Sequence, residues 1–178
     1  AGRYDRFMRK DRAAYEEMCA HIRPVVKAKT VLDLATGTGL IAKHIVNAAA
    51  HIEATDASAE MIAKAKRDNH SAKLHFSVQD MFRLPYADES FDVVIVSNAL
   101  HIVPKPEKAL QEIKRVLKDD GVLIAPTFTH AGNSFSGMVR AFFMRMAGFP
   151  LRSKWTSEEY LTFLRQNGWT VRKSAVLK

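Results

Sequence analysis

A short apolar segment that runs directly into a glycine loop constrains this sequence more than any other feature. Residues 30–35 predict a buried strand, Gly37 and Gly39 follow at once, and a helix is expected over residues 38–49. Glycine permits unusual backbone angles and a close approach of the chain to a ligand. The free N–H groups at the start of such a helix commonly bind nucleotide-like ligands. We therefore expect a nucleotide-binding turn here.

The charge of this turn narrows the choice of ligand. Asp33 stands at the expected end of the strand, four residues before Gly37. A carboxylate at this position repels the pyrophosphate of a dinucleotide and attracts a ligand that carries a cation. The sequence therefore favours a cationic nucleotide-like ligand.

Strand and helix patterns alternate from residue 30 to residue 128. The later strands are expected at His51–Asp56, Lys73–Gln79, Phe91–Ser97 and Val122–Phe128. Helices are expected over residues 5–23 (ended by Pro24), Ser58–Asn69, the segment after Pro104 and Pro106, and the capping-box segment Thr156–Gln166. Alternation of this kind predicts an α/β fold with a doubly wound, mostly parallel sheet and helices on both faces.

The length of 178 residues indicates one domain, 1–178. We expect an N-terminal helical cap over residues 1–29 and a ligand-binding core over residues 30–128. A lid over residues 129–168 and a final strand over residues 169–178 would follow. Its Met- and Phe-rich part, residues 133–148, is read either as a cover over a second pocket or as an ordinary core helix.

The net charge of +8 is unevenly distributed, because the basic excess lies on both sides of the predicted core. Residues 126–178 hold eight basic and two acidic side chains, and residues 1–29 hold eight and four. Nucleic acid, a phospholipid surface, an acidic small substrate or a plain solvated surface can each explain this excess. Basic residues do not cluster with aromatic ones, so no nucleic-acid partner is expected.

Other classes of protein are disfavoured by composition. No apolar run approaches the roughly 20 residues that a membrane span requires, so any membrane contact is expected to be peripheral. The single cysteine, Cys19, excludes an internal disulfide framework and predicts a buried thiol and a cytoplasmic location. The seven histidines lack ligand spacing and no cysteine pair exists, so no metal site is expected.

Carboxylates stand at the ends of three successive predicted strands: Asp33, Asp56 and Asp80. The carboxyl ends of parallel strands form the ligand crevice of an open α/β sheet, so these side chains are expected to gather there. An acidic residue after the second strand commonly accepts hydrogen bonds from ribose hydroxyls, and Asp80 can accept one from an exocyclic amine such as that of adenine. The alternative is that the three carboxylates only cap or solvate strand ends.

Five short motifs occur in order along the chain. They are Leu32–Gly39, Asp56, Gln79-Asp80-Met81 ahead of Leu84-Pro85, Ser90–Val94 and Leu117–Gly121. In this order the sequence resembles the class I S-adenosylmethionine-dependent methyltransferases. It is most similar to their small-molecule branch (methyltransferase type 11), typified by the ubiquinone and menaquinone C-methyltransferases. The resemblance implies a Rossmann-like fold and S-adenosylmethionine as the cofactor, with S-adenosylhomocysteine as its product. It also implies a small-molecule methyl acceptor. The aromatic and Met-rich segment 133–148 indicates an apolar or flat acceptor, and the basic excess of residues 126–178 favours an anionic one.

The resemblance also assigns residues to the cofactor. They are Asp33, Ala35, Thr36, Gly37, Gly39, Asp56, Ala57, Met61, Asp80, Met81 and Asn98. Tyr15 is expected to touch the cofactor as well, because the N-terminal helix can close over it. Asp33 and the turn after it would hold the methionyl ammonium, Asp56 the ribose, and Asp80 the adenine amine. Met81 would offer its N–H to an adenine ring nitrogen, and Asn98 would line the methyl-donor side.

A general base is needed only if the acceptor must lose a proton, and His101 and His130 are the candidates, in that order. Two departures from the family pattern are visible. Ala35 stands where glycine is usual, although alanine is common in this branch. The family's seventh strand is not expected in the chain as far as Lys178.

Two alternatives remain open on the sequence. Gly37-x-Gly39-x-x-Ala42 also matches a dinucleotide-binding fingerprint, and Asp56 follows at a plausible distance, although Asp33 opposes a pyrophosphate. A Walker loop is excluded because Leu40 rather than lysine follows the second glycine. A protein of the same fold that binds the cofactor only as a regulator or scaffold is the other alternative, and turnover with any acceptor distinguishes it.

Overall fold

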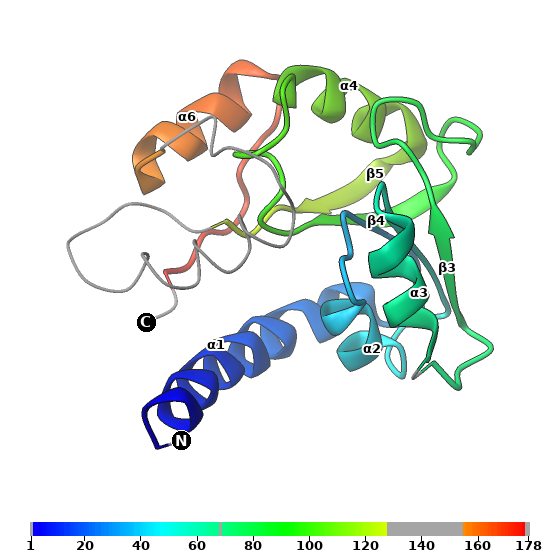
Figure 1. The fold of residues 1–178 in the computed structure, drawn as a ribbon. Coiled ribbons are helices and arrows are strands. Elements are labelled where there is room, and N and C mark those ends of the chain that lie inside the picture. The colour runs from blue at the N-terminus through cyan, green and yellow to red at the C-terminus, as the bar shows by residue number, and fades with distance from the viewer. Residues whose placement is uncertain (1, 68, 128–154, 177–178) are drawn as a thin grey trace.

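Five parallel strands form one twisted sheet at the centre of the molecule (Figure 1). The computed structural model describes residues 2–67, 69–127 and 155–176. The strands are β1 (Thr30–Leu34), β2 (His51–Asp56), β3 (Leu74–Val78), β4 (Phe91–Val96) and β5 (Leu117–Ile124), in the spatial order β3-β2-β1-β4-β5. The predicted parallel α/β fold is therefore confirmed.

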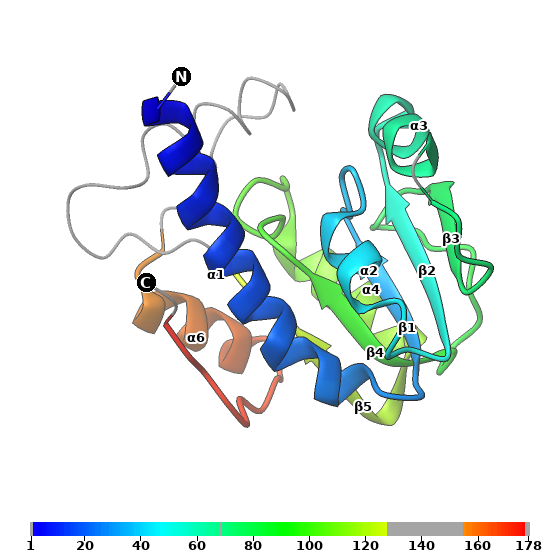
Figure 2. The same cartoon turned by 90° about the horizontal axis from the view of Figure 1, so that it is seen from below.

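Helices cover both faces of this sheet, as predicted. One face carries α1 (Gly2–Val26), α2 (Leu40–Ile45) and α3 (Ala59–Arg67). Seen from below, α1 and α2 lie in front of the strands, and α3 lies near the end of β2 (Figure 2). The other face carries α4 (Pro106–Val116) and α6 (Ser157–Gln166). Successive residues of a strand point to opposite faces, so each strand supplies both cores. Val31 packs under the first group of helices and Leu32 under the second.

The order of the strands determines where a ligand site is expected. From β1 the chain moves outward to β2 and β3, then returns to the other side of β1 to form β4 and β5. Ligands of open α/β sheets bind beyond the carboxyl ends of the strands, where this order reverses. The glycine turn after β1 and the loop after β4 meet at that point, between neighbouring parallel strands.

Local sequence signals explain several helix boundaries. Thr156 and Glu159 form the predicted capping box of α6, in which the Thr156 side chain accepts a hydrogen bond from the Glu159 N–H. The Ser58 hydroxyl accepts a hydrogen bond from the Met61 N–H at 3.3 Å, which agrees with its predicted role at the start of α3. Cys19 is 1% exposed and lies in the first core, as expected.

The first two helices differ from their predicted bounds. α1 continues past Pro24 to Val26, because a proline in the last turn removes few helical hydrogen bonds while the buried Ile22 and Val26 anchor that turn. α2 spans only residues 40–45. Gly39 before it has φ 76°, a left-handed angle outside the helix, and the chain after Ile45 tightens into turns that bond back to the Ile45 carbonyl.

The C-terminal predictions also need correction. β5 begins at Leu117 rather than Val122, because Leu117 is already extended and pairs with Phe91 across a register shift. The expected strand over residues 169–178 is not formed in the described part, residues 169–176, which pair with no strand of the sheet and are largely exposed. The segment 133–148 lies outside the described residues. Within the described ranges, no helix is long and apolar enough to cross a membrane.

Candidate functional site

Asp33 lies inside β1, not at its end, and its side chain is only 1% exposed. The Thr36 hydroxyl donates a 2.6 Å hydrogen bond to its Oδ2. Burial raises the pKa of Asp33 to about 7, and the nearby negative charge of Asp56 adds to this shift, while hydrogen bonds from Thr36 and the backbone of Ala42 oppose it. The carboxyl group thus lies beneath the turn, where it acts on a ligand through the turn and through its charge.

Asp56, the last residue of β2, holds the glycine turn in place. Its Oδ2 accepts the Gly37 N–H at 2.9 Å, and its Oδ1 accepts the Ser58 N–H at 2.8 Å. Each carboxylate oxygen has two lone pairs, so each can still accept a hydroxyl hydrogen. A Cβ built on Gly37 meets no atom within 4 Å, so the space over the turn is open. The predicted ribose carboxylate therefore has both the capacity and the room for that role.

The structure requires glycine at positions 37 and 39 of the turn for different reasons. Both have positive φ, 58° at Gly37 and 76° at Gly39, which favours glycine. A Cβ on Gly39 would stand 2.5 Å from a ring atom of Phe76 on β3. The close approach at Gly39 is thus to a core aromatic ring. Ala35 also has a left-handed φ, 53°, which explains why glycine is usual at this position.

Asp80 and Met81 follow β3 in a compact turn. The Asp80 Oδ1 accepts the Phe82 N–H at 2.9 Å, and its carbonyl accepts the Arg83 N–H at 3.1 Å. The Gln79 N–H donates to the Asp56 carbonyl at 3.1 Å, so this turn lies directly beside the end of β2. Asp80 is exposed. The carboxyl groups of Asp56 and Asp80 thus belong to adjacent strand ends, as predicted.

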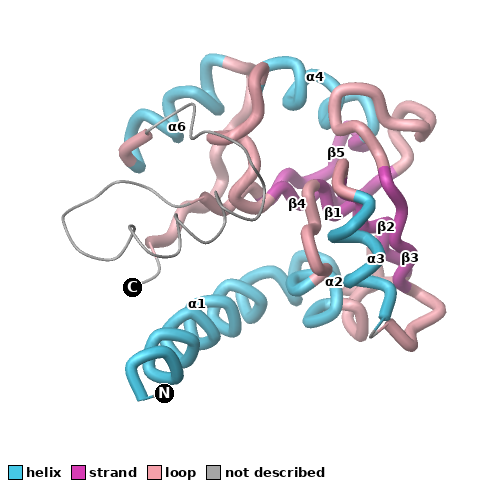
Figure 3. Tube along the Cα trace, viewed as in Figure 1, coloured by secondary structure: helices cyan, strands magenta, loops and turns pink. Residues whose placement is uncertain are grey.

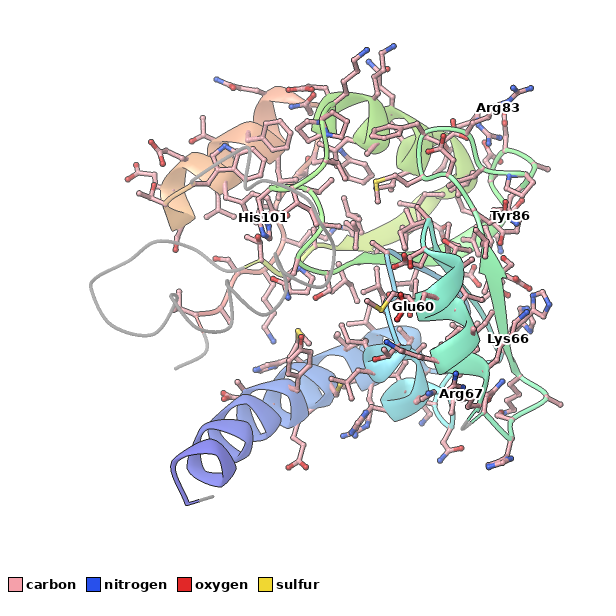
Figure 4. The ribbon with its side chains drawn as sticks, in the orientation of Figure 1. Glu60, Lys66, Arg67, Arg83, Tyr86 and His101 are labelled. Atoms are coloured by element: carbon pink, nitrogen blue, oxygen red, sulfur yellow. The ribbon has the colours of Figure 1, made fainter. Side chains whose placement is uncertain are left out.

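The loop after β4 carries Asn98 and His101. Asn98 has φ 52°, and its N–H donates to the Pro126 carbonyl beyond β5 at 2.9 Å. The His101 Nδ1 lies 3.1 Å from the Thr127 Oγ1. Figure 4 shows His101 beyond the end of β4, on the side of the molecule where α6 lies. His130, the second candidate base, lies outside the described residues.

The remaining predicted residues lie at the margins of this arrangement. Ala57 is exposed after β2, and Met61 is half-buried in the first turn of α3. Tyr15 on α1 is partly buried and packs against the core beneath α1 and α2. No group of three histidine, cysteine, aspartate or glutamate side chains within the described ranges is arranged to hold a metal ion.

Several residues that support the site could not be predicted from the sequence. The buried Thr55 accepts the Thr36 N–H with its carbonyl at 2.9 Å, and Phe76 fills the space beside Gly39. Arg115 on α4 binds the loop that follows the Asp80 turn. Each of these contacts joins residues far apart in the chain, and no local motif marks them.

The comparisons with known proteins agree with this geometry. A family model described as a methyltransferase domain matches residues 32–125. The demethylmenaquinone methyltransferase of Renibacterium salmoninarum is 38% identical over 105 residues, which cover 59% of this chain and 44% of that protein. The malonyl-[acyl-carrier protein] O-methyltransferase of Pectobacterium atrosepticum is 32% identical over 142 residues, 80% of this chain and 54% of that protein.

A solved structure supports the same fold. The S-adenosylmethionine-dependent methyltransferase from Aquifex aeolicus superposes with a TM-score of 0.73 at 19% identity, over 90% of this chain and 82% of its own. This chain belongs to the methyltransferase domain family, with the class I sheet. It spans about half the length of the curated relatives it matches. Neither alternative, a dinucleotide enzyme or a non-catalytic binding protein, gains support from these comparisons. The family implies S-adenosylmethionine as the cofactor, and the open turn and free carboxylate lone pairs described above fit it.

Proposed function

We propose that the protein transfers the methyl group of S-adenosylmethionine to a small-molecule acceptor. The observation that carries the proposal is the placement of Asp56 and Asp80 at adjacent strand ends beside an open glycine turn, within a methyltransferase sheet. When bound, the cofactor supplies a methyl group already activated on a sulfonium. The chain's main task is then alignment of two reactants, which can contribute roughly 7–11 kcal/mol to lowering the barrier.

Each carboxylate has a distinct part in this proposal. Asp56 accepts the two ribose hydroxyls with its remaining lone pairs, and Asp80 accepts the adenine amine. Asp33 is buried beneath the turn, and burial favours its neutral form. A cationic methionyl end bound above the turn favours the negative form, and the two opposite charges then attract each other through the turn.

His101 is the proposed base where the acceptor loses a proton. A neutral imidazole has one donor and one acceptor nitrogen. The Thr127 hydroxyl can accept from the Nδ1–H, and the Nε2 is then the nitrogen that takes a proton. His101→Gln should lower kcat by about 10²–10⁴-fold and leave the affinity for the cofactor unchanged. An unchanged kcat with the acceptor that the wild type uses would exclude His101 as the base.

The acceptor is proposed to be a small molecule, apolar or anionic in character. Its reacting atom is expected on the methyl-donor side of the site, at the loop after β4 that carries Asn98 and His101. The relatives named above act on a demethylmenaquinone and on a malonyl-[acyl-carrier protein], and both are therefore acceptors to assay by release of S-adenosylhomocysteine.

Calorimetry tests the cofactor assignment before any acceptor is known. The wild type should bind S-adenosylhomocysteine, and Asp56→Ala and Asp80→Ala should each weaken binding by about tenfold or more, since each removes a hydrogen bond to a charged group. NAD serves as the matched competitor and should not bind. Equal affinities for the wild type and both variants would refute the assignment.

A further inference from the structure

The connection between β3 and β4 contains no helix. Residues 79–90 form a loop throughout, which Figure 3 draws between the end of β3 and the start of β4. The loop carries Asp80 and Met81 at its beginning, and only Leu84 is deeply buried, at 5% exposure. A loop of this length has no hydrogen-bond ladder of its own, so its backbone needs partners elsewhere.

Those partners come from the last turns of α4. Arg115 Nη2 donates to the Leu84 carbonyl at 3.1 Å, and Nη1 donates to the Tyr86 carbonyl at 2.8 Å and to the Asp88 Oδ1 at 2.7 Å. The same guanidinium donates to both carboxylate oxygens of Glu112, at 2.7 and 3.0 Å. One side chain therefore fixes three positions of the loop.

Glu112 completes the arrangement. Its Oε1 accepts the Leu84 N–H at 2.8 Å, so both backbone groups of Leu84 bind to α4. The Arg115 carbonyl accepts the Glu89 N–H at 2.9 Å. The hydrogen bonds from Arg115 lower the pKa of Glu112, which keeps it a carboxylate and a strong acceptor. Figure 4 shows Arg83 and Tyr86 on this loop at the side of α4.

The candidate site lies at the N-terminal end of loop 79–90, which Arg115 and Glu112 hold against α4. Asp80 is four residues before Leu84, and the intervening turn is closed by local bonds from Phe82 and Arg83 to Asp80. At the start of this turn, the Gln79 N–H donates a hydrogen bond to the Asp56 carbonyl at the end of β2. A compact turn fixed at both ends can be displaced only if one of the ends moves.

We propose that Arg115, together with Glu112, is a positioning residue that presents the Asp80 carboxylate and the Met81 N–H to the adenine of the cofactor. This inference rests on the proposed function. Arginine suits the task because its planar fork donates in several fixed directions, whereas lysine offers a single ammonium. Arg115→Lys therefore retains the charge beside Glu112 and loses bonds to the loop.

The test compares two ligands that differ only at the edge of the base that Asp80 and Met81 are proposed to bind. S-adenosylhomocysteine presents an exocyclic amine and a ring nitrogen that accepts a hydrogen bond. S-inosylhomocysteine presents an oxo group, which a carboxylate repels, and a ring N–H that cannot accept from the Met81 N–H. The wild type should prefer the former by about tenfold or more in calorimetry. In Arg115→Lys this preference should fall to about twofold, because the carboxylate is no longer held against the base.

Lys118→Gln is the matched control. Lys118 donates to the Asp92 Oδ1 at 2.8 Å, near the starts of β4 and β5, at the opposite end of the strands from the site. Its loss removes a comparable ion pair and should leave the tenfold preference intact. Glu112→Gln, which removes one acceptor from the clamp, is the second variant should Arg115→Lys not fold, and it should also lower the preference.

The outcomes separate the two proposals. An unchanged preference in a folded Arg115→Lys or Glu112→Gln protein, or an equal loss in Lys118→Gln, would overturn the positioning role while leaving the function intact. A wild type that binds neither ligand would overturn the proposed function and this inference with it.

Discussion

Gly39→Ala should be strongly destabilising, and the structure gives the reason. Gly39 is buried with φ 76°, and an added Cβ would stand 2.5 and 2.6 Å from two ring atoms of Phe76. The Phe76 ring is itself 2% exposed in the first core, so it has no free space to move into. Alanine here combines an unfavourable backbone angle with a steric overlap.

The size of the effect follows from three contributions. A non-glycine residue in the left-handed region costs about 1–2 kcal/mol. Forcing a packed core to accept an extra methyl group costs about 1–3 kcal/mol. Replacing glycine also restricts the unfolded chain, which offsets roughly 0.5–1 kcal/mol. The free energy of unfolding should therefore fall by roughly 3 kcal/mol.

Urea unfolding followed by circular dichroism measures this change, with Gly37→Ala as the control. Gly37 has a similar φ, 58°, but its added Cβ meets no atom within 4 Å, so its loss should be about 1 kcal/mol. If the Phe76 ring is the obstacle, the double variant Gly39→Ala/Phe76→Leu should lose about 1 kcal/mol or more less stability than the sum of the losses of the two single variants. Equal losses for the two glycine variants, with no recovery in the double variant, would refute the reasoning.

Two further predictions concern stability. Burial raises the pKa of Asp33 to about 7, well above that of an unfolded carboxyl group, so the unfolded chain releases this proton first. As the pH rises from about 4 to about 7, the contribution of Asp33 to the free energy of unfolding therefore falls, by at most about 1.4 kcal/mol per pH unit. Asp33→Asn should gain stability relative to wild type across that window in urea titrations, and a difference independent of pH would contradict the raised pKa. Thr156→Ala should lower the free energy of unfolding by about 1 kcal/mol through loss of the capping box. Thr162→Ala, at an exposed position within the same helix, should lower it by less in the same urea titrations.

The sequence predicts the sheet well because its signals are local. The continuous apolar run of β4 and the glycine turn after β1 each identify their element without help from the rest of the chain. Parallel pairing then brings Asp56 and the Asp80 turn to adjacent strand ends, since topology alone places the carboxyl ends together. The capping box at Thr156 is equally local.

Other features depend on contacts through space. Asp33 is buried because the turn and α2 cover its side chain, and the Ala42 backbone of that helix donates to it. Glycine is required at position 39 because the Phe76 ring, on another strand, leaves no room for a Cβ. Three of the five hydrogen bonds that Arg115 donates reach a loop about 30 residues away in the chain. The final segment, residues 169–176, has strand-like composition, but it forms no pairing with the sheet, and pairing decides whether such a segment becomes a strand.

The central claim is that the carboxylates of Asp56 and Asp80, at the ends of β2 and β3, bind the methyl donor beside the turn that covers Asp33. A crystal structure with S-adenosylhomocysteine tests it most directly. The account predicts ribose hydroxyls on Asp56, the adenine amine on Asp80, and the amino acid end above the turn that covers Asp33. Density for the ligand elsewhere on the molecule, or a pyrophosphate of NAD bound at the glycine turn in a parallel soak, would contradict it.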